Sequence, residues 1–515
     1  MNLISVAFIV FLPCLFFLYF IFPLQVRWLV LLAGSCIFYA WSGWEAYSFV
    51  IAAWIVTYGC SRMLSVLYQN AGMTEKKTAS NVKKRARWIL LPGILMLLGM
   101  LIYSKMAEQI ADAVSSILQG HPLTLPVIIP LGISYYTFSA IGYLADVYWK
   151  KDPAEKNPLK LFLFLLYFPH ITQGPIPKHR KLAGELTEGH RFEYDRVCFG
   201  VQRIIWGYFK KLVIADRFAV IVRAVLGNDT NYEGLLLLLG IMASAVQLYT
   251  DFSGCMDIAL GISEVLGIPL DENFRRPFFA KSAAEFWRRW HITLGTWFKD
   301  YVYMPIVVSP WLLKLTNASR KRLGKRFARN LMTVIPLAVV WFLTGLWHGT
   351  GADYIAWGIW WGSIIILSTI FSPELKKLTE RLHIDSTSVY YHIFQMLRTF
   401  LIFCVGRLLT APGDLSRSCE IVGRIFGKWN PWIFFDGTLY RLGLDRYDFW
   451  LGILSLLLLW FISLQQEKGV QIRRKIAACP LAIRWMIYLG AIFAVLTFGM
   501  YGVGHDPGAF IYTRY

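Results

Sequence analysis

The sequence predicts an all-α polytopic membrane protein. Its 515 residues are 56% hydrophobic and only 16% charged, with a mean hydropathy of +0.49, and a soluble domain of this length normally carries more charge. A spanning helix needs about 20 mostly apolar residues, and roughly eleven stretches satisfy this requirement. Apolar runs near 1–22, 28–43, 124–148 and 204–226 are among them. We expect one transmembrane domain over residues 1–515, with short re-entrant or interfacial helices.

One apolar segment, residues 159–175, is not counted as a span. It is short and ends in the sequence G-P-I-P, and helix-breaking residues at membrane depth are typical of re-entrant or interfacial pieces.

The net charge of +20 has two interpretations, a nucleic-acid surface or a marker of membrane topology. Six basic residues gather between Lys76 and Arg87 and seven between Lys314 and Arg329, whereas residues 106–149 and 224–274 contain no Lys or Arg. This alternation favours topology, with the basic clusters in the cytoplasm. It predicts a multi-pass protein of the cell (inner or plasma) membrane, in contact with lipid and not with nucleic acid. Both termini, the turn near 228–233 and the turn after His348 would lie outside the cytoplasm.

Several kinds of site are disfavoured by the absence of their motifs. The eight cysteines show no C-x-x-C spacing, and the chain contains no Walker loop, H-E-x-x-H or G-x-S-x-G motif. We therefore expect no metal site and no bound cofactor.

Residues 285–305 concentrate charge, aromatic rings and one histidine. At helical spacing, their apolar residues form one face of a helix at or through the interface. Arg288 and Arg289 either snorkel to lipid headgroups or bind the phosphates of an anionic donor. His291 either acts in chemistry or is a satisfied structural histidine. The apolar face comprises Phe286, Trp290, Leu294, Trp297 and Phe298.

A second histidine, His348, lies at the end of a hydrophobic run among Gly345, Gly349 and Gly351. These glycines allow close approach of a substrate or of a neighbouring helix. Histidine suits acyl transfer, because its pKa near neutrality lets it take a hydroxyl proton and return it to a thiolate.

Asp251 lies in an apolar run that has no basic residue. An intramembrane carboxylate is a functional candidate, although a link to Arg288 or to a helix N-terminus explains it equally well.

Several blocks together resemble the membrane-bound O-acyltransferase superfamily, most closely its alginate O-acetyltransferase branch. The most specific are F-W-R-R-W-H and, about 57 residues later, W-H-G. Similar blocks are P-L-G-I-S-Y-Y-T-F from Pro130, W-G-Y-F-K-K from Trp206, E-N-F from Glu272 and the terminal F-I-Y from Phe510. The specific similarity covers roughly residues 125–365.

The resemblance implies a ring of helices around a central tunnel. It places the superfamily's catalytic histidine at His348 and the second tunnel histidine at His291. The further candidates for lining the substrate tunnel are Asp251, Asn273, Arg288, Arg289, Trp290 and Trp347.

The sequence departs from the family pattern at two places. Trp361 stands where relatives often carry a third histidine, so this chain cannot use a histidine at that position. The run from Gly406 to Ala411 stands where the alginate branch commonly shows Phe-Arg-Ala. The outer acceptor region is therefore expected to differ.

The implied activity is transfer of an acyl group, acetyl by preference, from a cytoplasmic thioester. The co-substrate would be acetyl-CoA or an acyl carrier protein, and the acceptor a hydroxyl on an extracytoplasmic polysaccharide or an acyltransferase- or esterase-like partner protein. The alternatives are D-alanyl transfer to teichoic acid, a transporter or flippase with a His and Asp proton path, and a membrane scaffold. The chain shows no inverted repeat, which weakens the transporter interpretation.

Overall fold

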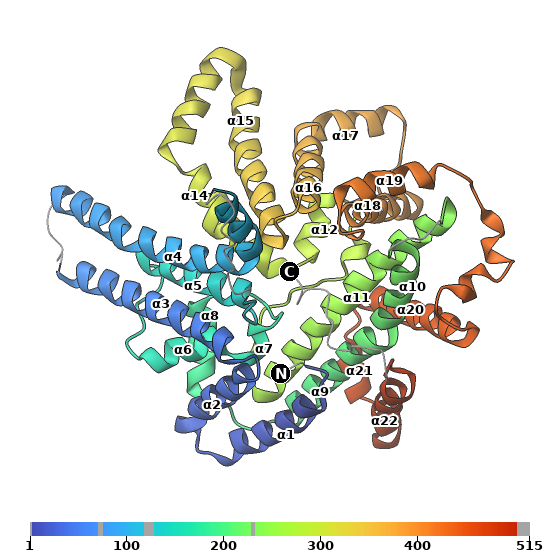
Figure 1. Cartoon of the computed structure of the whole chain (residues 1–515), viewed down its shortest axis with the longest axis horizontal. Coiled ribbons are helices and arrows are strands. Elements are labelled where there is room, and N and C mark those ends of the chain that lie inside the picture. Colours follow the sequence, from blue (N-terminus) through green and yellow to red (C-terminus); the bar gives the residue numbers. More distant parts are fainter. Residues whose placement is uncertain (1–2, 71–75, 118–127, 228–231, 502–515) are drawn as a thin grey trace. The chain divides into compact units, whose positions relative to one another are not determined.

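The chain folds into helices that range from one turn to more than forty residues (Figure 1). The computed structural model describes residues 3–70, 76–117, 128–227 and 232–501. Over these residues the regular structure is helical, apart from one isolated antiparallel bridge between Phe274 and Trp290. The predicted all-α class is confirmed. Three predicted features lie outside the described residues: most of the turn expected near 228–233, both chain ends and the F-I-Y block from Phe510.

Eight helices in the described part of the chain are long and apolar enough to cross a membrane. Other apolar runs fall on shorter helices. Run 204–226 covers the end of α9 (Tyr194–Tyr208), the π-helical segment η2 (Phe209–Ala215) and α10 (Asp216–Leu226), and the described part of run 124–148 contains α5 (Ile133–Tyr148). The eight are α3 (Trp44–Asn70), α4 (Lys76–Ile117, apolar over Ser80–Ala107), α11 (Leu235–Leu266), α15 (Pro310–His348), α16 (Ala352–Ile370), α18 (Val389–Thr410), α20 (Arg446–Glu467) and α22 (Leu481–Phe498).

The described residues group into two compact units. The first contains residues 3–204 and 255–271, and the second contains 205–254 and 272–501, so α9 and α11 contribute to both. Besides the long helices α3 and α4, the first unit holds α1 (Val6–Ile21), η1 (Leu24–Val26), α2 (Arg27–Ala40), α5 (Ile133–Tyr148), α6 (Pro158–Leu166), α7 (Phe168–Ile171), α8 (His179–Glu188) and most of α9 (Tyr194–Tyr208).

The core of the first unit surrounds α5 to α7. All of α5 up to Val147 is buried, and Phe168 of α7 packs against Phe8 and Phe38. Segment 159–175 forms α6 and α7, which are buried and too short to span. This agrees with its exclusion from the predicted spans.

The second unit contains the remaining elements. Beyond the long helices α15, α16, α18, α20 and α22, these are η2 (Phe209–Ala215), α10 (Asp216–Leu226), η3 (Pro277–Phe279), α12 (Ala283–Arg289), α13 (Ile292–Phe298), η4 (Lys299–Tyr303), α14 (Met304–Val307), α17 (Ser372–Arg381), α19 (Leu415–Ile425), η5 (Pro431–Phe434), η6 (Thr438–Arg441) and α21 (Ile472–Ala477).

Helix α15 carries the basic cluster at one end and His348 at the other. Pro310 occupies its first turn, where the missing N–H is tolerated. Gly324 has φ 86° and ψ 170°, so the chain turns back there and α15 consists of two helical limbs (Figure 1). The second limb packs against α16, and α16 packs against α18. Only Gly349, Thr350 and Gly351 connect His348 to α16, which places the histidine at a tight turn.

Candidate active site

The segment around His291 is a break between two short helices. Ser282 caps α12 by accepting a hydrogen bond from the Glu285 N–H at 3.2 Å. The helix ends at Arg289, Trp290 is extended, and His291 adopts the left-handed conformation (φ 45°, ψ 52°) before α13 begins. This conformation costs a non-glycine residue about 1–2 kcal/mol. The expectation of a single helix here is wrong, although all five residues of the predicted apolar face are buried.

A backbone bridge holds this break in place. The N–H of Arg275 donates to the Arg289 carbonyl at 2.9 Å, and the N–H of Ile292 donates to the Asn273 carbonyl at 3.0 Å. These bonds flank the bridge between Phe274 and Trp290. The strained conformation of His291 is therefore fixed by pairing with residues 273–275.

Asn273 lies against the ring of His291. Its Oδ1 is 3.2 Å from His291 Nδ1, and both residues are buried. Burial lowers the pKa of His291 to about 3, because charging an imidazole away from water is unfavourable. His291 is consequently neutral at physiological pH.

The two histidines share one aromatic neighbour. The ring of Trp347 lies 5.8 Å from that of His291 and 4.7 Å from that of His348, both edge to face. His348 also contacts Trp357 at 4.9 Å, and it is 7% exposed. The structure thus brings His291, Asn273, Trp347 and His348 into one cluster in the second unit.

The glycines around His348 serve helix packing and the turn. A Cβ on Gly345 would lie 2.6 Å from the Tyr354 carbonyl oxygen of α16, and one on Gly349 would lie 2.2 Å from the Tyr354 ring. A Cβ on Gly351 would meet the carboxylate of Asp353. Of the two sequence interpretations, the structure bears out close approach of a neighbouring helix.

Asp251 forms a buried ion pair with Lys211. The Nζ of Lys211 is 2.7 Å from Asp251 Oδ1 and 2.8 Å from Asp216 Oδ1, and all three residues are at most 4% exposed. Burial alone would lower the pKa of Lys211, but attraction to the two carboxylates raises it above its ordinary value. The expected link from Asp251 to Arg288 is not what the structure shows. The adjacent Phe252 lies 5.0 Å from the His291 ring, which places the ion pair beside the cluster.

Lys211 lies in the π-helical segment η2 together with a second buried lysine. Lys210 and Lys211 are both buried, and Lys210 donates to the carbonyl and hydroxyl of Ser253 at 2.9 and 3.0 Å. A wider helical turn is frequent at functional sites. The sequence predicts W-G-Y-F-K-K only as a block of the family resemblance, and this buried lysine network was not predicted. The available signal was a pair of lysines inside an apolar run, with Asp216 five residues after Lys211.

Arg288 and Arg289 differ in their environment. Arg289 contacts Glu285 at 2.7 Å and Glu467 of α20 at 2.9 Å, and Arg276 contacts Glu467 at 2.6 Å. Arg288 is exposed and makes no ion pair with another described residue. Among the described residues, the charge of Arg289 is therefore compensated and that of Arg288 is not.

Trp290 belongs to the aromatic packing beneath the break. It stacks on Phe286 at 5.4 Å and contacts Phe403 at 5.1 Å. Trp361 also stacks on Phe286, with 5.6 Å between the two ring centroids. A Cβ on Gly406 would lie 3.1 Å from Trp361 Nε1. The two departures from the family pattern, at 361 and 406, therefore touch.

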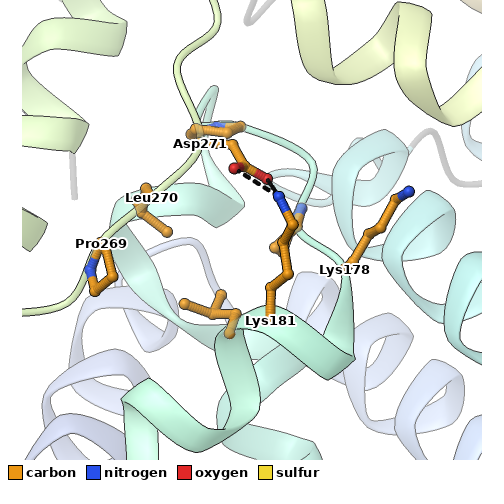
Figure 2. A pocket seen from close by; sticks show the side chains of 8 residues that line it. Lys178, Lys181, Pro269, Leu270 and Asp271 are labelled. Atoms are coloured by element: carbon orange, nitrogen blue, oxygen red, sulfur yellow. Dashed lines mark hydrogen bonds and ion pairs between the residues drawn. The ribbon is translucent and has the colours of Figure 1, made fainter. Parts of the chain in front are cut away.

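A separate hollow of about 150 Å³ lies on the first unit (Figure 2). Lys181 reaches Asp271 across it at 3.1 Å, while Lys178 lies apart from that pair. Because the carboxylate offsets Lys181, this hollow does not concentrate positive charge. It is lined by Pro175, Pro177, Lys178, Lys181, Leu182, Pro269, Leu270 and Asp271.

The described residues contain no group of three or more His, Cys, Asp or Glu side chains arranged to hold a metal ion.

Comparison with known proteins decides the family. The model of the membrane-bound O-acyltransferase family matches residues 36–407. The chain belongs to the membrane-bound O-acyltransferase family. This confirms the resemblance predicted from F-W-R-R-W-H and W-H-G, and it makes the protein a membrane acyltransferase.

Relatives within the family transfer different groups, according to their names. The probable alginate O-acetylase AlgI of Pseudomonas putida is 31% identical over 435 residues, which are 82% of this chain and 80% of the relative. The peptidoglycan O-acetyltransferase of Helicobacter pylori is 28% identical over 401 residues, covering 71% and 70%. The teichoic acid D-alanyltransferase of Bacillus subtilis is 32% identical over 254 residues, covering 48% and 60%.

Proposed function

We propose that this membrane O-acyltransferase passes an acetyl group from a cytoplasmic thioester to a hydroxyl on an extracytoplasmic polysaccharide or partner protein. The observation that carries the proposal is the contact of both histidine rings with Trp347, in a chain similar to O-acetyltransferases. The biological process would be O-acetylation of a cell-surface or exported polysaccharide. The protein would lie in the cell membrane, with both of its termini outside the cytoplasm.

In the proposed reaction His348 is the general base. It takes the proton of the acceptor hydroxyl as that oxygen attacks the thioester carbonyl, and it returns the proton to the departing thiolate. An ester C–O bond forms and the C–S bond breaks, so the products are an ester and a free thiol. His291 orients the substrate or polarises the carbonyl.

Arg288 is the proposed contact for the donor. Its exposed, uncompensated guanidinium suits the phosphates of acetyl-CoA or of the phosphopantetheine on an acyl carrier protein. Arg289 is instead neutralised by Glu285 and Glu467. Neither donor is a bound cofactor, because each is consumed as a co-substrate.

D-alanyl transfer to teichoic acid is the second candidate. Two teichoic acid D-alanyltransferases are among the relatives and match 48% and 53% of this chain, whereas the probable alginate O-acetylases and the peptidoglycan O-acetyltransferase match 71–90%. The chain also continues through residues 416–515, beyond the matched family region, and this extended C-terminal region favours the polysaccharide O-acetylation branch. Purified protein supplied with acetyl-CoA, acetyl carrier protein or D-alanyl carrier protein would separate the two activities by the thiol released.

The test is label transfer from radiolabelled acetyl thioester into extracytoplasmic material, using cells with native protein, His348→Ala or His291→Ala at matched membrane abundance. Loss of transfer in His348→Ala is expected, because general base catalysis contributes roughly 10²–10⁴ in rate. Persisting transfer would contradict the assignment. Release of thiol in proportion to acylated acceptor distinguishes the enzyme from a flippase or scaffold.

A further inference from the structure

The side-chain oxygen of Asn273 accepts hydrogen bonds from two neighbouring residues. It lies 3.0 Å from the backbone nitrogen of Thr293, 3.0 Å from the Thr293 hydroxyl and 3.2 Å from His291 Nδ1. A backbone N–H is only a donor, so the asparagine atom at this position is the carbonyl oxygen and not the amide nitrogen. The backbone N–H of Thr293 thus settles which end of the Asn273 amide is the oxygen and which is the nitrogen.

This orientation determines the tautomer of His291. An acceptor oxygen 3.2 Å from Nδ1 requires that Nδ1 carry the hydrogen. In a neutral imidazole, the other nitrogen then has a lone pair and no hydrogen. Nε2 of His291 is buried and has no hydrogen-bond partner among the described residues.

The surroundings of the ring leave this lone pair for a substrate. Phe252 and Trp347 approach the imidazole edge to face at 5.0 and 5.8 Å. The ring stays neutral because it is buried, so Nε2 does not gain a proton from the medium near pH 7. A neutral ring in this tautomer can accept a hydrogen bond through Nε2 but cannot donate one to a carbonyl oxygen.

We propose that Asn273 is a positioning residue that holds His291 as its Nδ1–H tautomer, so that His291 meets the substrate with the Nε2 lone pair. The inference rests on the proposed acyl transfer and selects between the two roles of His291 stated there. His291 orients an N–H or O–H group of a substrate and does not polarise the thioester carbonyl. Asn273 itself acts only through the histidine.

A direct test reads the tautomer without any transfer reaction. Solid-state NMR of the full chain, labelled with ¹³C and ¹⁵N histidine in liposomes, separates the two neutral tautomers. A difference spectrum against His291→Ala assigns the signals. The native protein should show the Nδ1–H form, and Asn273→Ala should show loss or mixing of it. An Nε2–H form in the native protein overturns the proposal.

A second test covers the case in which Asn273→Ala does not fold. Asn273→Asp keeps an acceptor oxygen, so the Nδ1–H tautomer should persist, while the added negative charge raises the pKa of His291. The acid limb of the transfer rate should shift to higher pH. An unshifted limb in a folded Asn273→Asp variant counts against contact between the two residues.

Thr293→Val is the matched control for the NMR experiment. It removes one hydroxyl donor from Asn273 and keeps both the backbone N–H and the contact with His291. The Nδ1–H signal should therefore survive. Its loss would mean that local packing, and not Asn273, sets the tautomer. If native protein transfers no label, the proposed function fails, whereas the tautomer result stands by itself.

Discussion

The carboxylate of Asp251 lies 2.7 Å from the ammonium of Lys211, inside the second unit and beside the histidine cluster. Lys211 also contacts Asp216 at 2.8 Å, so one cation holds two buried carboxylates together. The stability lost on substitution should depend on which of the three residues is replaced, because a buried charge without a partner is much less favourable than a neutral side chain.

Replacing Lys211 should therefore destabilise the protein more than replacing Asp251. Lys211→Met leaves two carboxylates without their shared cation, and breaking a buried pair costs roughly 3–5 kcal/mol. Asp251→Asn leaves Lys211 paired with Asp216. Thermal unfolding of both variants in the same detergent measures the order. Equal midpoints would contradict it, and loss of transfer in Asp251→Asn at an unchanged midpoint would give Asp251 a role in chemistry.

The histidine positions and the ion pair differ in how far the sequence predicts them. His291 and His348 lie in motifs that are unusual for a membrane segment, and the structure places both against Trp347. Lys211 is 40 positions from Asp251, and hydropathy contains no information on which buried charges meet across such a separation. Lys211 lies in the π-helical segment η2, a local distortion that hydropathy does not predict either.

The break at His291 was also hidden from the sequence. Residues 286–294 contain no glycine or proline, and their apolar spacing fits one helix. The chain breaks there because residues 273–275 pair with residues 289–292. Tertiary pairing has overridden a local helical pattern, at a position where the sequence separately indicated function.

Substitution of Arg288 and of Arg289 should affect different properties. Arg289→Gln removes the contacts to Glu285 and Glu467 and should lower stability by on the order of 1 kcal/mol, as partly exposed pairs do. Arg288→Gln should leave the unfolding midpoint unchanged and raise the KM for the thioester tenfold or more, since a hydrogen bond to a charged group contributes about 1.5–3 kcal/mol. Steady-state kinetics with each variant measures this. An unchanged KM in Arg288→Gln would assign its charge to lipid anchoring.

The pH dependence of stability should report the buried His291. An unfolded histidine binds a proton below about pH 6.5, whereas burial lowers the pKa of folded His291 to about 3. Between these values the unfolded chain binds more protons, so stability falls as the pH drops from 6.5 toward 3. His291→Gln should make the unfolding midpoint less dependent on pH in this window. His383→Gln, at an exposed position, is the control. Identical slopes for native protein and His291→Gln would contradict the burial argument.

A single methyl group should disturb the approach of α15 to α16. In Gly345→Ala the new Cβ would lie 2.6 Å from the Tyr354 carbonyl oxygen, which is too close without backbone movement. Because His348 lies one turn away, both the unfolding midpoint and the transfer rate should fall. Gly490→Ala in α22 is the control, since its Cβ meets no atom within 4 Å. Native transfer and stability in Gly345→Ala would show that the two helices adjust freely.

The contact between Trp361 and Gly406 predicts a coupling between their substitutions. Trp361 is fully buried, so Trp361→His should leave unfilled space and destabilise the fold. Gly406→Val should destabilise it for the opposite reason, because a Cβ there already lies 3.1 Å from Trp361 Nε1 and 3.5 Å from Trp357 Nε1.

In the double variant the valine occupies part of the space that the indole leaves. Contacting residues typically couple by about 0.5–3 kcal/mol, so the double variant should be more stable than the sum of the single effects predicts. Additive unfolding free energies would contradict this coupling.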